Sequence, residues 1–265
     1  MRVGIDVGGT LIKIAYESEK GMQFRKFAAT KLDEAAKWVM EKFPDGEVCV
    51  TGGKAERFQA CMGREVGLVA EFEATCRGIR HLLNQNGHGL DAFVVANVGT
   101  GTSIHYIDGE GHRRIGGTGV GGGTIMGLSA LLCGIDEYDK IVRLAKEGNR
   151  GTVDLKVRHI YEGSVPPISG DLTASNFGRV SAEREVGDVL AAVIGLVGET
   201  VATVSVFAAE QCRTSSIVFI GTSFVENGPL QAVVKSYAAM KEADPVFVKN
   251  GEFSGALGAL FLNQP

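Results

Sequence analysis

The sequence predicts an α/β protein of two similar lobes with a ligand cleft between them. Strand-like and helix-like segments alternate along its 265 residues. An apolar strand, a glycine turn and a threonine-led return strand occur twice, at 5–10 and 96–102. Glycine is also frequent, with 37 Gly against 6 Pro, which is typical of tight turns and of loops whose backbone faces a ligand. Two such lobes would place their glycine turns across one cleft, where small ligands commonly bind.

The first half is predicted to form a strand meander followed by alternating helices and strands. Apolar residues recur on one side of segment 32–42, as in an amphipathic helix, and the glycines at 87 and 89 end a later helix. The predicted strands are 2–7, 10–16, 22–28, 47–50 and 65–70, and the predicted helices are 32–42 and 71–84.

The second half repeats the strand–turn–strand pattern and then becomes mainly helical. A glycine loop over 116–124 is expected to precede a helix, whereas 152–178 shows no clear period. The predicted strands are 92–97, 102–107, 112–115, 216–220 and 245–248, and the predicted helices are 125–132, 136–146, 187–211, 228–240 and 254–262.

Composition excludes several classes of protein. The 27 Lys and Arg against 31 Asp and Glu give a net charge of −4 without a basic block, so nucleic-acid binding is not expected. Five cysteines without a CxxC pair argue against a disulfide framework or a zinc ribbon. No leader-like segment precedes the first strand, so we expect a cytoplasmic protein.

The most apolar stretch covers residues 189–209. Its uninterrupted run ends at Gly198, because Glu199 follows and Thr200, Thr203 and Ser205 lie beyond. A membrane span needs about 20 apolar residues with few charges. We therefore expect a helix that is buried in a lobe or between subunits, and no membrane partner.

The first glycine turn has the composition of a phosphate-binding site. Gly8 and Gly9 leave backbone N–H groups free to bind phosphate oxygens, and Thr10 and Lys13 add a hydroxyl and a cation. Asp6 supplies the anionic oxygen that Mg²⁺ needs, directly or through water. A plain β-hairpin with a solvated Lys13 is the structural alternative. The turn is neither a P-loop nor a Rossmann fingerprint, since no GxxxxGK[ST] occurs and a strand follows it.

The two turns look like the first and second phosphate loops of the actin/hexokinase/acetate kinase superfamily. More narrowly, the chain resembles the type II pantothenate kinases of staphylococci and bacilli over nearly its whole length. The matching segments are 3–13, 71–74, 96–103, 113–117, 154–161, 170–178 and 251–259.

This resemblance implies a fold and an activity. The fold would have two actin-like (RNase H-like) lobes: residues 1–92 with helix 252–265 packing back on them, and residues 93–251. The activity would be the phosphorylation of pantothenate to 4′-phosphopantothenate, the first step toward coenzyme A, with ATP and Mg²⁺. The resemblance also suggests a homodimer.

Glu71 is the candidate general base for such a transfer. It lies between a predicted strand and a predicted helix, where a carboxylate can face a cleft and accept a hydroxyl proton. Glu73 is the rival, but two residues along a helix it points to the opposite side. The resemblance favours Glu71. A purely structural alternative is a carboxylate that offsets the helix dipole.

Further site residues follow from the resemblance. Arg114 would bind the acceptor, with Arg113 less favoured, because an arginine can hold a carboxylate through paired N–H donors. Thr100 and Thr102 would line the meeting point of phosphate and acceptor. The nucleotide set comprises Asp6, Gly8, Gly9, Thr10, Lys13, Thr100, Gly101, Gly122, Gly123, Thr124, Ile125, Met126, Tyr138 and Thr222.

Two other functions stay open at this point. One is a kinase of the same superfamily that acts on a sugar, acetate or another amide alcohol. The other is a nucleotide-sensing actin-like protein without an acceptor. The glycine loops fit all three, whereas the segments around Glu71 and Arg114 favour a pantothenate kinase.

Overall fold

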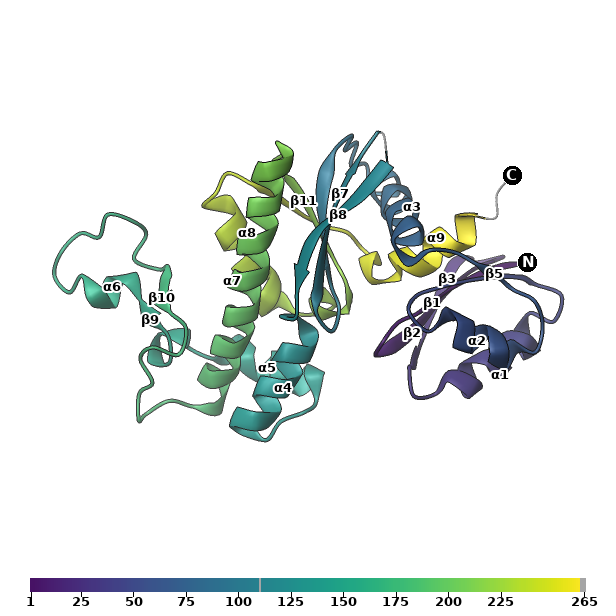
Figure 1. Cartoon of the computed structure of the whole chain (residues 1–265). Helices are drawn as coiled ribbons and strands as arrows, with labels where there is room; N and C mark the ends of the chain where they lie inside the picture. The colour runs from purple at the N-terminus through teal and green to yellow at the C-terminus, as the bar shows by residue number, and fades with distance from the viewer. Residues whose placement is uncertain (110, 263–265) are drawn as a thin grey trace.

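Two five-stranded sheets lie on opposite sides of the molecule and form two lobes (Figure 1). The computed structural model describes residues 1–109 and 111–262. Residues 263–265, the end of the segment expected to pack back on the first lobe, lie outside the described residues.

The first sheet has the strand order β3-β2-β1-β4-β5. Its β1–β2–β3 meander is antiparallel, whereas β4 and β5 run parallel to β1 and to each other. Alternate residues of β1 and β2 are fully buried under α1 and α2, which gives this lobe its core. The elements are β1 (Arg2–Val7), β2 (Leu11–Ser18), β3 (Gly21–Ala28), α1 (Leu32–Lys42), β4 (Glu47–Thr51), α2 (Ala55–Met62) and β5 (Gly67–Leu68).

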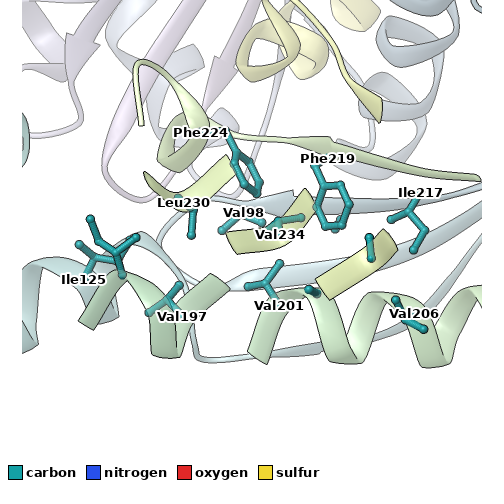
Figure 2. Packing of buried hydrophobic residues seen from close by; sticks show 14 of the residues in the cluster. Val98, Ile125, Val197, Val201, Val206, Ile217, Phe219, Phe224, Leu230 and Val234 are labelled. Atoms are coloured by element: carbon teal, nitrogen blue, oxygen red, sulfur yellow. The ribbon is translucent and has the colours of Figure 1, made fainter. Parts of the chain in front are cut away.

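The second sheet has the order β12-β11-β6-β7-β8 and carries the larger core (Figure 2). Helix α7 crosses this core and packs against α4, α5 and α8. Val197, Val201 and Val206 of α7 line this core together with Val98, Phe219 and Ile217 of the sheet. The elements are β6 (Phe93–Val98), β7 (Thr102–Asp108), β8 (Gly111–Thr118), α4 (Gly122–Cys133), α5 (Tyr138–Glu147), α7 (Val186–Cys212), β11 (Ser216–Ile220), α8 (Gly228–Ala239) and β12 (Asp244–Phe247).

Helices α3 (Glu71–Gln85) and α9 (Ser254–Leu262) lie between the two sheets (Figure 1). Helix α9 contacts β1, β2 and β4, whereas Ile79 of α3 packs with Phe93 of the second sheet. The two helices approach closely at glycines. A Cβ on Gly78 would lie 1.9 Å from the carbonyl oxygen of Ser254, and one on Gly258 would lie 1.6 Å from that of Ala74. Larger residues at these positions would push the lobes apart.

Residues 150–180 form an excursion beside α7 (Figure 1). A buried ion cluster holds it: Arg150 binds Glu199 of α7 at 2.6 Å and Asp154 at 2.6 Å. This contact explains why a glutamate interrupts the apolar helix, since a buried charge needs a partner. The elements are a 3₁₀ turn (Arg150–Thr152), β9 (Leu155–Lys156), α6 (Val157–Ile160) and β10 (Thr173–Ser175).

Most predicted elements are present, but the structure differs from the prediction in several places, and the short elements β9, α6 and β10 were not predicted. Helix α2 was not predicted, and the strand expected over 65–70 contains only β5. Gly116 and Gly117 belong to β8, and Gly122 and Gly123 belong to α4, so the glycine loop is shorter than expected. Helix α7 is long and apolar enough to cross a membrane, but most of its apolar window is buried inside the lobe, as expected for a core helix.

Candidate active site

The two glycine turns meet across a cavity of about 340 Å³, the central cavity. The hydroxyl of Thr10 on the first turn lies 2.9 Å from that of Thr100 on the second, so a hydrogen bond bridges the lobes. Ten predicted site residues line this cavity. They are Asp6, Gly8, Gly9, Thr10, Lys13, Glu71, Thr100, Gly101, Thr102 and Thr222.

Asp6 and Lys13 form an ion pair at the floor of the central cavity. They are direct partners in the β1–β2 register, and Lys13 Nζ lies 3.1 Å from Asp6 Oδ2. Gly52 and Gly255 leave room for this carboxylate, because a Cβ at either position would lie within 3.0 Å of it. The pair therefore places one carboxylate and one cation beside the first turn.

Glu71 enters the same cavity as the first residue of α3. Desolvation in the cleft and the nearby Asp6 charge raise the pKa of the Glu71 carboxyl, while Lys13 lowers it. A raised pKa suits a general base, because the carboxylate then accepts a proton more readily. Glu73 does not line the central cavity, which agrees with its position on the other side of the helix.

A second cavity of about 410 Å³, the side cavity, adjoins the central one through Thr10, Thr100 and Thr222. It is mainly apolar, and Tyr138 forms part of its wall. Burial raises the pKa of the Tyr138 hydroxyl to about 12, and this hydroxyl donates to the carbonyl of Ser223 at 2.6 Å. The predicted residues that line it are Thr10, Thr100, Gly122, Gly123, Met126, Tyr138 and Thr222.

The start of α4 does not offer free N–H groups to a ligand. The N–H groups of Gly122 and Gly123 donate to the carbonyls of Gly99 and Thr100, each at 2.8 Å. These glycines therefore hold the second turn in place and present their Cα surface to the side cavity. A Cβ on Gly122 would lie 2.5 Å from the hydroxyl oxygen of Ser223, so a larger residue would not fit.

Two residues of the predicted nucleotide set lie outside both cavities. Ile125 is fully buried in the core of the second lobe (Figure 2). The Thr124 hydroxyl accepts from Gly121 N–H at 3.2 Å and donates to the carbonyl of Gly119. Both side chains therefore contact other parts of the protein and neither cavity, because the helix turns them away.

The predicted acceptor-site residues also differ in their distance from the central cavity. Thr102 lines the central cavity, but its hydroxyl donates to the carbonyl of Val120 at 2.7 Å. Arg114 lies on β8 outside the cavity lining, with Nη2 close to Gly117. Gly117 pairs with Ser103, which does line the cavity, so the guanidinium lies beside its rim. Arg113 instead lies over the ring of Tyr106.

Sequence reasoning missed several residues of the central cavity. Asn97 and Ser103 are register partners in the β6–β7 hairpin, at the place that Asp6 and Lys13 occupy in the first. The repeat at 5–10 and 96–102 already aligns Asn97 with Asp6, but neither Asn97 nor Ser103 was assigned to the site. Thr75 comes from α3, Ser254 from the start of α9, and Glu252 from the 3₁₀ turn Gly251–Phe253 just before α9; none of them carried a local signal.

The side chains described here offer little capacity to bind a metal by themselves. Among residues 1–109 and 111–262, no group of three His, Cys, Asp or Glu side chains could hold a metal ion. Asp6 by itself suits Mg²⁺, which is usually bound by one or two carboxylates together with water and substrate phosphates. The site fits an ion that arrives with a polyphosphate rather than a resident metal centre.

Comparisons with known proteins agree with this geometry. The sequence model of the Fumble family matches residues 17–262. Type II pantothenate kinases of Staphylococcus aureus strains USA300 and NCTC 8325 are 44% identical over 268 residues, covering 100% of both chains.

Solved structures share the fold at lower identity. A ROK-family glucokinase from Streptomyces griseus, in complex with glucose and AMPPNP, has a TM-score of 0.59 at 15% identity and covers 98% of both chains. A ROK hexokinase from Thermus thermophilus has a TM-score of 0.51 at 15% identity, covering 97% of this chain and 96% of its own. The two lobes are thus those of the actin-like kinases, and the chain belongs to the Fumble family of type II pantothenate kinases.

Proposed function

We propose that the protein is a kinase that transfers the γ-phosphoryl group of ATP to pantothenate, forming 4′-phosphopantothenate in the first step of coenzyme A biosynthesis. The observation that carries the proposal is the placement of Glu71 beside the Asp6–Lys13 pair, facing both glycine turns. The full-length similarity to type II pantothenate kinases supports the choice of acceptor.

In the proposed reaction, the side cavity binds the nucleotide base and sugar, and the central cavity holds the reacting groups. The side cavity takes the adenosine, so that Tyr138 and Met126 contact it and the phosphates reach the turns at Gly8 and Gly99. Lys13 neutralises phosphate charge, because a cation beside the transferring group stabilises the transition state. Thr100 and Thr102 lie where phosphate and acceptor hydroxyl meet.

Proton transfer falls to Glu71. Its carboxylate takes the proton of the pantothenate hydroxyl as that oxygen attacks the γ-phosphorus. Arg114 holds the pantothenate carboxylate from the rim of the cavity through charge-assisted hydrogen bonds. Mg²⁺, when bound with ATP, neutralises charge on the phosphates, and Asp6 would hold it through water.

The remaining proposals concern assembly and location. We propose a homodimer formed through the face beside α7, where Phe207, Met240 and Ile168 are exposed around one apolar groove of about 380 Å³. We also propose a cytoplasmic protein without a membrane or nucleic-acid partner. The lobes divide at 1–92 with 252–265, and at 93–251. Sedimentation at micromolar concentration would contradict the dimer by showing only a 28.0 kDa species.

The test of the activity is ATP consumption with different acceptors. Pantothenate should stimulate release of ADP and yield 4′-phosphopantothenate by mass spectrometry, whereas glucose and acetate should leave the rate at background. Stimulation by glucose or acetate alone would assign the protein to another kinase of the same fold. A protein that binds ATP but consumes none with any of these acceptors would be a nucleotide sensor.

A further inference from the structure

His105 is a buried titratable group that the proposed reaction does not use. It lies in the middle of β7 and is only 4% exposed. Neither ring nitrogen has a hydrogen-bond partner among the described residues. A buried polar group without a partner destabilises the fold, so its presence calls for an explanation.

The surroundings of His105 keep its ring neutral. Burial, together with the positive charges of Arg114 and His112, lowers the pKa of the imidazole to about 4. At neutral pH the ring therefore has one N–H donor and one nitrogen that can only accept.

One side of the ring contacts the start of α3. The ring centroids of Phe72 and His105 lie 4.5 Å apart with an interplanar angle of 43°. Phe72 directly follows Glu71, and the residue before the helix is Ala70, which has no side chain to cap the first turn. The Phe72–His105 contact therefore holds the turn that carries Glu71.

The other neighbour of the ring is Arg114. The two residues are register partners on β7 and β8, so their side chains lie on the same face of the sheet. A carboxylate at position 105 would pair with the guanidinium and neutralise it. A neutral imidazole carries no charge and leaves that of the guanidinium available for an anionic substrate.

We propose that His105 is a positioning residue of the acceptor site, which fixes Glu71 through Phe72 and, as a neutral strand partner, leaves the charge of Arg114 free for the acceptor. The proposal rests on the proposed function, because it assigns His105 to the side that binds pantothenate. It predicts no effect on ATP, since His105 lies outside both cavities.

Three variants separate the aromatic contact from the neutrality of the ring. His105→Phe keeps the aromatic contact with Phe72 and carries no charge, so kcat and the pantothenate KM should both stay near wild type. His105→Ala removes the contact with Phe72, so kcat should fall by about ten- to a hundredfold. His105→Asp adds a carboxylate that pairs with Arg114, so the pantothenate KM should rise about tenfold or more. The ATP KM should stay unchanged throughout.

Controls distinguish positioning from loss of folding. Thermal unfolding and the ATP KM report whether each variant is folded, and Phe72→Ala combined with His105→Ala should reduce kcat no further than either change alone. Folded His105→Ala and His105→Asp variants with wild-type kcat and pantothenate KM would overturn the proposal for His105. A wild-type protein that ignores pantothenate would instead overturn the proposed function, and the acceptor site with it.

Discussion

The two glycine hairpins share a backbone but differ in charge. In the first, the register partners next to the turn are Asp6 and Lys13, joined by an ion pair. In the second, the equivalent partners are Asn97 and Ser103, which are neutral. Similar hairpins thus hold different chemistry. The ionisable groups of the central cavity come from the first hairpin, from the start of α3 and from the 3₁₀ turn before α9.

The hairpins also differ in what holds their turns. The second turn is fixed by two backbone hydrogen bonds from Gly122 and Gly123 of α4. The first turn has the Gly8 N–H bonded to Leu11 within the hairpin, and Lys54 Nζ bonded to the carbonyl of Gly9 at 3.1 Å. The comparison suggests that the second turn is a rigid support, whereas the first carries the charge that acts on phosphate.

The largest effect is expected when the first hairpin is made to resemble the second. Asp6→Asn keeps the size of the side chain but removes the carboxylate that would hold Mg²⁺, and it leaves Lys13 without its partner. Turnover with pantothenate should fall by about 10³-fold or more, measured as ADP release at ordinary Mg²⁺ concentrations.

Asn97→Ala is the matched change in the second hairpin. It removes only neutral hydrogen-bonding capacity, so kcat/KM should fall by less than about tenfold. Equal losses at the two positions would show that the charge difference between the hairpins has no catalytic meaning.

The next effect concerns Glu71, which faces the charged hairpin. Glu71→Gln keeps size and most hydrogen bonding but cannot accept a proton, so kcat should fall by about 10²–10⁴-fold while the ATP Kd holds. Glu73→Gln is the control on the same helix and should change little. A large loss of kcat in Glu73→Gln with a normal Glu71→Gln variant would show that Glu73, and not Glu71, is the base.

The pH dependence of kcat tests the same group. A general base works only when deprotonated, and the raised pKa of Glu71 moves the loss of activity to higher pH than for an ordinary glutamate. Activity should therefore fall as pH decreases through this raised pKa, and the Glu71→Gln variant should lose that limb. An identical acid limb in the variant would exclude Glu71 as its origin.

How far the sequence predicts this site depends on how local each feature is. The charged hairpin is encoded in one short segment, so Asp6, Gly9 and Lys13 could be identified before the fold was known. The neutral partner Asn97 was missed because it lacks a charge. Its meaning depends on the match between two hairpins that lie far apart in the chain.

Differences in the fold have similar causes. Helix α2 buries only Phe58 and Met62, so its eight residues carry too weak an apolar period to be recognised. Gly122 and Gly123 are poor helix formers, yet they begin α4 because the carbonyls of the second turn bind their N–H groups. Tertiary contacts of this kind override local propensity and cannot be derived from a single segment.

A smaller effect is expected at the rim of the cavity. Arg114→Ala removes the cation that would bind the pantothenate carboxylate, so the pantothenate KM should rise about ten- to a hundredfold while the ATP KM stays nearly constant. Arg113→Ala, on the neighbouring residue that lies over Tyr106, is the control and should change neither. An equal rise in both KM values after Arg114→Ala would indicate a role at the phosphate instead.

The smallest effect is expected at the contact that joins the hairpins, the hydrogen bond between the hydroxyls of Thr10 and Thr100. Thr10→Val and Thr100→Val each remove one hydroxyl at nearly constant shape. An exposed neutral hydrogen bond contributes about 1 kcal/mol or less, so each variant should raise the ATP KM by no more than about fivefold. The double variant should match either single one, because the same bond is lost once. Additive effects in this cycle of ATP KM measurements would show that each hydroxyl acts separately on the nucleotide, so that the hairpins contribute independently rather than through their contact.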